Sequence, residues 1–213
     1  MKIKIAPSIL SADKSKLQEE VNDIEYCADL IHVDIMDGKF VPPKTFQASE
    51  IRKIKSKLPK DVHLMVEHPI KDGFIKDYTD AGASIITIHE ECKDDIKEAF
   101  DLIRNKSIKV GISIKPATAL DKIKEYLDEV DMVLIMSVNP GYAGQEFMPE
   151  VLPKIRELRK LKPNLDIEVD GGINAGTIKQ AAEAGANVFV AGSFIFKKEN
   201  REEVIKELKK AAK

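Results

Sequence analysis

Short apolar segments alternate with longer amphipathic segments along the whole chain. The apolar segments are six to eight residues long and rich in β-branched residues, which is typical of buried strands. There are eight of them, at residues 3–10, 29–36, 61–66, 84–89, 109–114, 132–138, 166–171 and 187–192. The segments between them have helical spacing, as in residues 11–28, where Leu17, Val21 and Ile24 recur after an N-cap candidate, Ser11 or Asp13.

Strands that alternate with helices favour right-handed βαβ units and a parallel sheet. Eight such units in 213 residues fit an α/β protein of one domain, residues 1–213, folded as an eight-stranded parallel (β/α)8 TIM barrel. The phrase Ala-Gly-Ala occurs at residues 81–83 and 184–186, and it is typical of a glycine-terminated helix that turns into the next strand. An open doubly wound sheet is the alternative, and it would ordinarily have fewer strands or a switch point.

The second apolar segment carries two polar residues on one face. Strand side chains alternate, so Ile31, Val33 and Ile35 would face the helices, while His32 and Asp34 would face the barrel axis, with Met36 after them. An unpaired buried carboxylate is costly, so Asp34 requires a partner.

The third and seventh segments supply that partner. The same parity turns His63 and Met65 inward, and likewise Glu168 and Asp170. Catalytic groups of such barrels lie at the carboxyl ends of the strands, where these side chains converge. We therefore expect one divalent metal ion with the ligands His32, Asp34, His63 and Asp170. Zinc is favoured, with iron, manganese or cobalt as alternatives.

These four side chains also have an interpretation without a metal. The four groups could form a hydrogen-bonded polar layer of the core, but two histidines and two aspartates at equivalent depth on three strands favour the metal. His89, at the end of the fourth segment, is expected to support the ligands or the fold, because four ligands already leave little room for substrate.

Glycine-rich loops follow the last three segments. Exposed backbone amides bind phosphate, and barrels often hold phosphate with the loops after strands seven and eight. The candidates for a phosphate site are Gly141 and Gly144, Gly171 and Gly172, and Gly192 and Ser193 at the start of a possible short helix.

A phosphate site beside a metal and two carboxylates predicts proton transfer next to the carbonyl of a phosphosugar. Asp34 and Asp170 would act on opposite faces of a metal-stabilised enediolate and so invert a stereocentre. Met36, Met65 and Met136 are ordinary core fillers one by one, but together they could shield the reacting carbon from water.

Composition and charge limit the partners and the cellular location that we expect. The net charge is −2, no basic stripe indicates nucleic acid, and no apolar run is long enough to span a membrane. The first ten residues lack the apolar block of a signal peptide, and Cys27 and Cys92 are expected to be reduced thiols. We expect a cytoplasmic protein that acts on a small molecule, without nucleic-acid or membrane partners, and that forms a homo-oligomer.

The chain resembles the ribulose-phosphate 3-epimerase family over nearly its whole length. The matching motifs are IAPSILSAD (5–13), IHVDIMDGKFVP (31–42), DVHLMVEHP (61–69), GISIKPAT (111–118), VLIMSVNPGYAGQEF (133–147), IEVDGGIN (167–174) and VAGSFIF (190–196). The resemblance implies interconversion of ribulose 5-phosphate and xylulose 5-phosphate in the pentose phosphate pathway.

The resemblance also implies residue roles. Asp34 and Asp170 would be the two bases as well as metal ligands with His32 and His63, and Asp34 would accept the proton of ribulose 5-phosphate. The three methionines match a thioether cluster of the family. The residues implied to contact the substrate are Ser8, His63, Gly141, Tyr142, Ala143, Gly144, Asp170, Gly171, Gly172, Gly192 and Ser193.

The sequence departs from the family pattern at residues 43–46, Pro-Lys-Thr-Phe, and at Tyr142-Ala143. A 3-epimerase of a hexulose 6-phosphate, such as allulose 6-phosphate, is therefore the first alternative. An aldolase or lyase with Lys115 as the Schiff-base residue is more distant, and a non-catalytic phosphosugar-binding barrel is the third.

Overall fold

Eight strands form one parallel sheet in the computed structural model, which describes residues 1–213. The strands are β1 (Lys4–Pro7), β2 (Ile31–Met36), β3 (Lys60–Met65), β4 (Ile85–His89), β5 (Lys109–Ile114), β6 (Met132–Met136), β7 (Asp166–Asp170) and β8 (Val188–Ala191). From β2 to β8 each strand pairs with the next one in the sequence, and β1 pairs with β8. A single parallel bridge between Ser8 and His32 connects β1 to β2, so the sheet closes and the predicted (β/α)8 barrel is confirmed.

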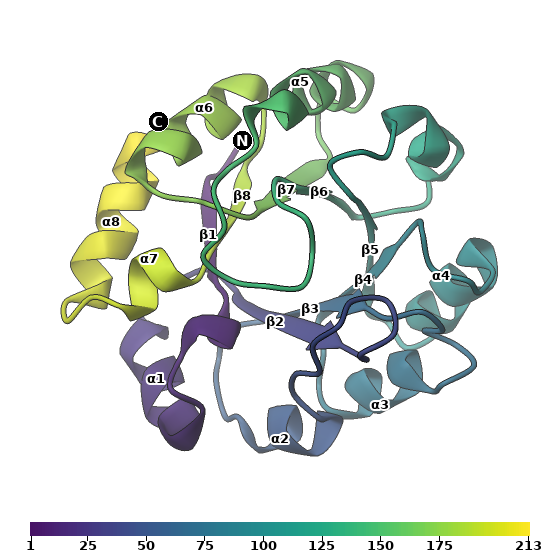
Figure 1. Ribbon diagram of the computed structural model, residues 1–213, viewed down its shortest axis with the longest axis horizontal. Helices are drawn as coiled ribbons and strands as arrows, with labels where there is room; N and C mark the ends of the chain where they lie inside the picture. The colour runs from purple at the N-terminus through teal and green to yellow at the C-terminus, as the bar shows by residue number, and fades with distance from the viewer.

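Helices surround the ring of strands (Figure 1). They are α1 (Leu17–Ile24), α2 (Ala48–Lys53), α3 (Phe74–Asp80), α4 (Ile96–Arg104), α5 (Leu152–Leu161), α6 (Ala175–Ala184), α7 (Ser193–Phe196) and α8 (Arg201–Ala211). Four 3-10 helices complete the set: η1 (Ile9–Ser11), η2 (Lys14–Lys16), η3 (Leu120–Tyr126) and η4 (Pro149–Val151). The connection from β5 to β6 is therefore made by a 3-10 helix instead of an α-helix. No helix combines the length and the apolar character that crossing a membrane requires.

The faces of the strands follow the predicted alternation. Ile31, Val33 and Ile35 belong to the large core between barrel and helices, whereas His32 and Asp34 are buried on the other face, within the barrel. Six apolar residues form a separate cluster within the barrel: Ala6, Leu30, Ile85, Met132, Val188 and Val190. The barrel interior is thus apolar in one part and strongly polar in another, and the polar part marks the site.

Two predicted elements have the wrong bounds at the start of the chain. The first strand, expected over 3–10, ends at Pro7, because the Ser8 hydroxyl accepts a hydrogen bond from the Leu10 amide (3.3 Å) and starts η1. The helix expected over 11–28 is α-helical only from Leu17 to Ile24, and Asp13 caps the 3-10 turn before it. Because β1 ends at Pro7, Ser8 lies just beyond the carboxyl end of this strand.

The glycines of the two Ala-Gly-Ala phrases behave as expected. Gly185 terminates α6 with φ of 115°, and Gly82 follows α3 with φ of 87°. Only glycine adopts this left-handed backbone readily, so each helix ends there and the chain turns into the next strand.

Candidate active site

A cavity of about 710 Å³ lies at the carboxyl ends of the strands. The loop between β6 and η4 crosses the centre of the ring in Figure 1 and forms part of the cavity wall. The sequence-predicted residues that line the cavity are Ser8, Asp34, Met36, Met65, Met136, Gly141, Tyr142, Ala143, Gly144, Asp170, Gly171, Gly172, Gly192 and Ser193. His32 and His63 do not line it, since both are fully buried behind the two carboxylates.

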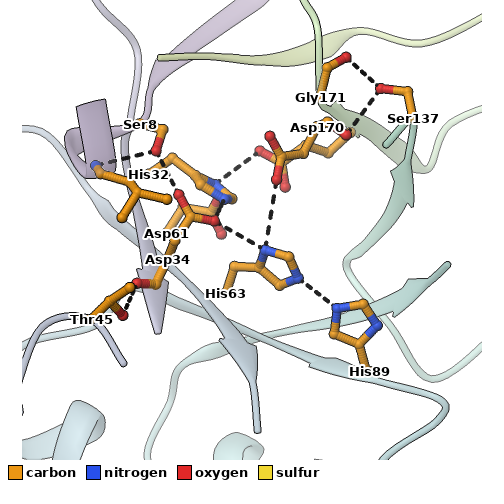
Figure 2. A network of polar contacts seen from close by, with 12 residues as sticks. Ser8, His32, Asp34, Thr45, Asp61, His63, His89, Ser137, Asp170 and Gly171 are labelled. Atoms are coloured by element: carbon orange, nitrogen blue, oxygen red, sulfur yellow. Dashed lines mark hydrogen bonds and ion pairs between the residues drawn. The ribbon is translucent and has the colours of Figure 1, made fainter. Parts of the chain in front are cut away.

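Asp34, Asp170 and the two histidines form one cluster (Figure 2). Each of His32, Asp34, His63 and Asp170 offers one ligand atom, and these four atoms lie within 4.8 Å of one another. The register between β2 and β3 sets Asp34 beside His63, and both imidazoles approach the same carboxylate oxygen, Asp34 Oδ1, at 3.4 Å. Asp170 reaches the cluster from β7, across the barrel, with its Oδ2 3.9 Å from His63 Nδ1.

Two ring nitrogens of this cluster lack a hydrogen-bond partner. His32 Nε2 and His63 Nδ1 are buried, and each faces the carboxylates. Nitrogen lone pairs that have no donor, beside two carboxylates, are the arrangement that a divalent cation would complete. The residues present therefore fit one metal ion.

Neighbouring groups orient His32 and Asp34. The other nitrogen of His32, Nδ1, contacts Asp61 Oδ2 at 2.7 Å, so a neutral His32 ring would have its proton on Nδ1 and its lone pair on Nε2. The Ser8 hydroxyl donates to Asp34 Oδ2 at 2.5 Å, which leaves Oδ1 for the cluster. Thr45 donates to the Asp34 carbonyl at 2.6 Å and ties the loop after β2 to the strand end.

Asp170 is positioned through its backbone. The Ser137 hydroxyl donates to the carbonyls of Asp170 and Gly171, at 2.9 and 2.7 Å (Figure 2). The Ser137 amide also donates to the Asp170 carbonyl, at 2.8 Å. These bonds join the ends of β6 and β7, so the carboxylate of Asp170 has a defined direction into the cavity.

The two carboxylates have opposite electrostatic environments. Burial disfavours the ionised form of Asp34, but the charge of His32 and contacts with both histidines hold its pKa well below the ordinary value. Burial, reinforced by the negative charge of Asp34, raises the pKa of Asp170 to about 7. Asp34 is therefore ionised at neutral pH, and without a metal Asp170 keeps a proton more readily than Asp34 does.

The histidines also differ. Burial lowers the pKa of His63, which keeps its imidazole neutral. Burial also opposes the charged form of His32, but the carboxylates of Asp34 and Asp61 outweigh it and raise the pKa of His32 well above its usual value.

Zinc binding at pH 7 is expected to release protons, because Asp170 and His32 must lose theirs to become ligands. Zinc affinity should rise with pH as long as these groups are protonated, and the contribution of Asp170 should level off above about pH 7. Calorimetry in two buffers of different ionisation enthalpy counts these protons. Asp170→Asn should release fewer protons than the unchanged chain, and pH-independent affinity would contradict the assignment.

The two glycines of the loop after β7 have no room for side chains. A Cβ added at Gly172 would lie 2.3 Å from the backbone nitrogen of Phe147, and one at Gly171 would lie 2.5 Å from a methyl group of Val138. Both glycines also have positive φ, of 64° and 123°. The loop after β7 therefore packs directly against the loop after β6, and both remain close to the cavity.

The remaining candidates from the sequence are three methionines, Ala143 and Lys115. Met36, Met65 and Met136 are buried at the cavity wall, as expected. Ala143 has an ordinary backbone, since Ser107 is the only non-glycine residue with positive φ. Lys115 does not line the cavity; its ammonium lies 4.0 Å from the centre of the Phe40 ring.

Sequence reasoning overlooked several residues of the site. Asp61 orients His32, and the alternation that turns His63 inward could have found it two residues earlier in β3. Glu91 contacts His89 from the loop after β4, where no periodic pattern applies. Lys197 and Lys198 are the only cationic side chains of the cavity wall, and they follow α7 beside the glycine loops.

Residues 4–196 match the model of the ribulose-phosphate 3 epimerase family. The chain is 42% identical to a ribulose-phosphate 3-epimerase of Bacillus subtilis over 97% of this chain and 98% of the relative. It is 41% identical to the Escherichia coli K12 enzyme of the same name, over 96% and 94% of the two chains. A rice relative described as the cytoplasmic isoform is 43% identical over 98% of this chain and 93% of its own.

Solved structures with the same fold are far less similar in sequence. A 3-hexulose-6-phosphate synthase from Salmonella typhimurium superposes with a TM-score of 0.74 at 15% identity, over 99% of this chain and 98% of the other. A protein called KGPDC from Streptococcus mutans has a TM-score of 0.76 at 13% identity, over 100% and 98%. At such identities the likeness concerns the fold alone.

Proposed function

The chain belongs to the ribulose-phosphate 3-epimerase family and is an isomerase, and from this premise we propose that it interconverts D-ribulose 5-phosphate and D-xylulose 5-phosphate. The observation that carries the proposal is the pair of carboxylates, Asp34 from β2 and Asp170 from β7, at the wall of one cavity. They come from different strands, so each could act on one face of a substrate carbon held between them.

One member of this pair removes the C3 proton, and the other supplies a different proton to C3. Asp34, ionised, takes the proton from C3 of ribulose 5-phosphate and leaves a planar enediolate. Asp170 would deliver a proton to the opposite face of C3, so the stereocentre is inverted. The reverse reaction exchanges the two roles.

The surroundings of the pair support this chemistry. A divalent cation held by His32, Asp34, His63 and Asp170 would supply positive charge that stabilises the negative charge developing on the substrate oxygens. We favour zinc, because two imidazole nitrogens and two carboxylate oxygens are a donor set that zinc accepts. We assign His63 a ligand role rather than substrate contact, since its ring is fully buried.

The phosphate end of the substrate would lie against the three glycine loops. Backbone amides near Gly144, Gly172 and Gly192 and the hydroxyl of Ser193 are the donors, all at one wall of the cavity. Met36, Met65 and Met136 would exclude water from C3.

Deuterium exchange tests the proposal. With ribulose 5-phosphate in D2O, the protein is expected to form xylulose 5-phosphate that carries deuterium at C3. Binding without deuterium at C3 would support a non-catalytic barrel instead.

The same assay with allulose 6-phosphate measures sugar preference, and a tenfold or greater advantage in kcat/KM for the hexulose would overturn the substrate assignment. Borohydride trapping of substrate on Lys115 would indicate an aldolase.

Ser193→Ala is expected to raise KM about two- to tenfold with kcat nearly unchanged, because it removes one hydrogen bond that substrate and transition state share. Steady-state kinetics with ribulose 5-phosphate checks this. Ser84→Ala, just before β4 at the opposite end of the barrel, is the control and should leave both constants unchanged. A fall in kcat without a change in KM would place Ser193 elsewhere in the mechanism.

The remaining parts of the proposal concern setting and assembly. Cytoplasmic location is supported by the name of the rice relative and by the free thiols of Cys27 and Cys92. A role in the pentose phosphate pathway accompanies the proposed substrate. A homo-oligomer stays a prediction, which sedimentation of the purified protein tests.

A further inference from the structure

A polar chain leads from His63 away from the cavity to Glu91. His63 Nε2 lies 2.9 Å from His89 Nε2, and His89 Nδ1 lies 2.9 Å from Glu91 Oε2. His63 is on β3, His89 ends β4, and Glu91 lies two residues later in the loop. Figure 2 shows the contact between the two rings on the side of His63 that faces away from Asp34 and Asp170.

Glu91, at the far end of this series of hydrogen bonds, can only accept hydrogen bonds. Glu91 Oε1 accepts from the Lys115 amide at 2.9 Å and from the hydroxyl of Thr118. Lys154 of α5 donates to the carbonyls of Lys115, Pro116 and Thr118, so the turn that supplies both donors is held in place. Glu91 is thus a fixed acceptor, and the third group bound to it, His89 Nδ1, must carry a proton.

The acceptor Glu91 determines where the protons of His89 and His63 lie. A neutral imidazole has one N–H and one lone pair. If His89 donates from Nδ1, its Nε2 accepts, and His63 must donate from Nε2. The lone pair of His63 is then on Nδ1, the nitrogen that has no hydrogen-bond partner and faces Asp34 Oδ1 and Asp170 Oδ2.

Burial makes this assignment strict. His63 and His89 are both fully buried, so water cannot replace a missing partner at either ring. The ring of Phe40 lies 4.7 Å from that of His89 and covers it from the loop after β2. Loss of either hydrogen bond of His89 would leave a buried donor or acceptor unpaired.

We propose that His89 and Glu91 are positioning residues that hold His63 as its Nε2–H tautomer, so that the Nδ1 lone pair is directed into the cluster of Asp34 and Asp170. The two histidines of the cluster then have opposite tautomers, since His32 contacts Asp61 through Nδ1 and directs Nε2 inward. This inference rests on the proposed function, because it gives the lone pair of His63 a metal ion to bind.

Nitrogen NMR of the unchanged protein tests the proposal first. The chain has four histidines, so ¹⁵N-labelled imidazoles give few signals, and His68→Phe identifies the signal of His68, which contacts neither the cluster nor His89. In zinc-loaded protein, His63 is expected to show a protonated Nε2 and an unprotonated Nδ1, and His32 the reverse. A proton on His63 Nδ1 would overturn the proposal without any variant.

Variants then separate positioning from packing. His89→Phe removes the acceptor, and we expect zinc affinity to fall about 10- to 100-fold, as is usual when the partner of a ligating histidine is lost. His89→Gln keeps a carbonyl oxygen that can accept from His63, so it should retain the His63 tautomer and most of the affinity. His68→Phe, the same substitution at a half-buried histidine bonded to Asp94, is the matched control and should bind zinc normally.

The outcomes distinguish this inference from the proposed function. Circular dichroism and thermal unfolding establish that each variant is folded, and Glu91→Gln provides a second break if His89→Phe is not. Equal zinc affinity and an unchanged His63 tautomer in folded His89→Phe would overturn the inference while the C3 exchange of the unchanged enzyme persists. Absence of that exchange in the unchanged protein would instead defeat the proposed function, whatever the tautomers are.

Discussion

Asp170→Asn is expected to lower kcat for epimerisation at least about 100-fold, and so is Asp34→Asn, because each removes one of the two proton-transfer groups. The two variants should nevertheless differ. In Asp170→Asn, Asp34 can still remove and return the C3 proton of ribulose 5-phosphate on one face, so solvent deuterium should enter without inversion. In Asp34→Asn, that exchange should be lost from ribulose 5-phosphate and persist with xylulose 5-phosphate.

The measurement is C3 exchange in D2O, followed with each epimer separately, together with the metal content of each variant. Metal content is needed because both carboxylates are also proposed ligands. Asp166→Asn, on the same strand as Asp170 but at the other end of the barrel, is the control and should turn over normally. Near-normal epimerisation by either active-site variant, or the same exchange pattern in both, would refute a two-base mechanism.

Removal of the metal by a chelator is expected to abolish turnover and to lower the melting temperature. Without a cation, the buried groups His32, Asp34 and His63 and the partly exposed Asp170 are four close ionisable side chains with two unpaired ring nitrogens. Zinc at a thousand times its dissociation constant would stabilise the folded state by about 4 kcal/mol, which corresponds to roughly 8–16 °C for a chain of this length.

Thermal unfolding with and without zinc measures this shift, and added zinc should restore both stability and turnover. His32→Gln is expected to show a much smaller zinc-dependent shift, because one ligand nitrogen is lost. His68→Phe, outside the cluster, should keep the full shift. Full turnover and an unchanged melting temperature after chelation would show that the cluster holds no required metal.

The alternation of side chains along single strands could be predicted from the sequence, because it is a local property of extended backbone. It correctly turned His32, Asp34, His63 and Asp170 to one face of the sheet, and it separated them from Ile31, Val33 and Ile35. The same rule applied two residues earlier would have included Asp61. Strand ends were less predictable, because a side-chain contact such as that of Ser8 with the Leu10 amide decides where pairing stops.

Contacts between strands could not be read in this way. The pairing of Asp34 with His63 and of Met136 with Asp170 depends on the register of neighbouring strands, which the connecting loops and the closed barrel set together. The hydrogen bonds from His63 through His89 to Glu91 join a strand, a strand end and a loop, and no spacing in the sequence predicts them.

The sequence by itself therefore determined the eight βα units, the barrel and the inward direction of the candidate residues, because period and composition are encoded along the chain. Only the tertiary structure decided which atoms meet: that two histidines present unpaired nitrogens to one carboxylate oxygen, and that Asp34 and Asp170 have opposite pKa shifts. Distances, burial and electric fields depend on segments that are remote in sequence and close in space, so they exist only in the folded barrel.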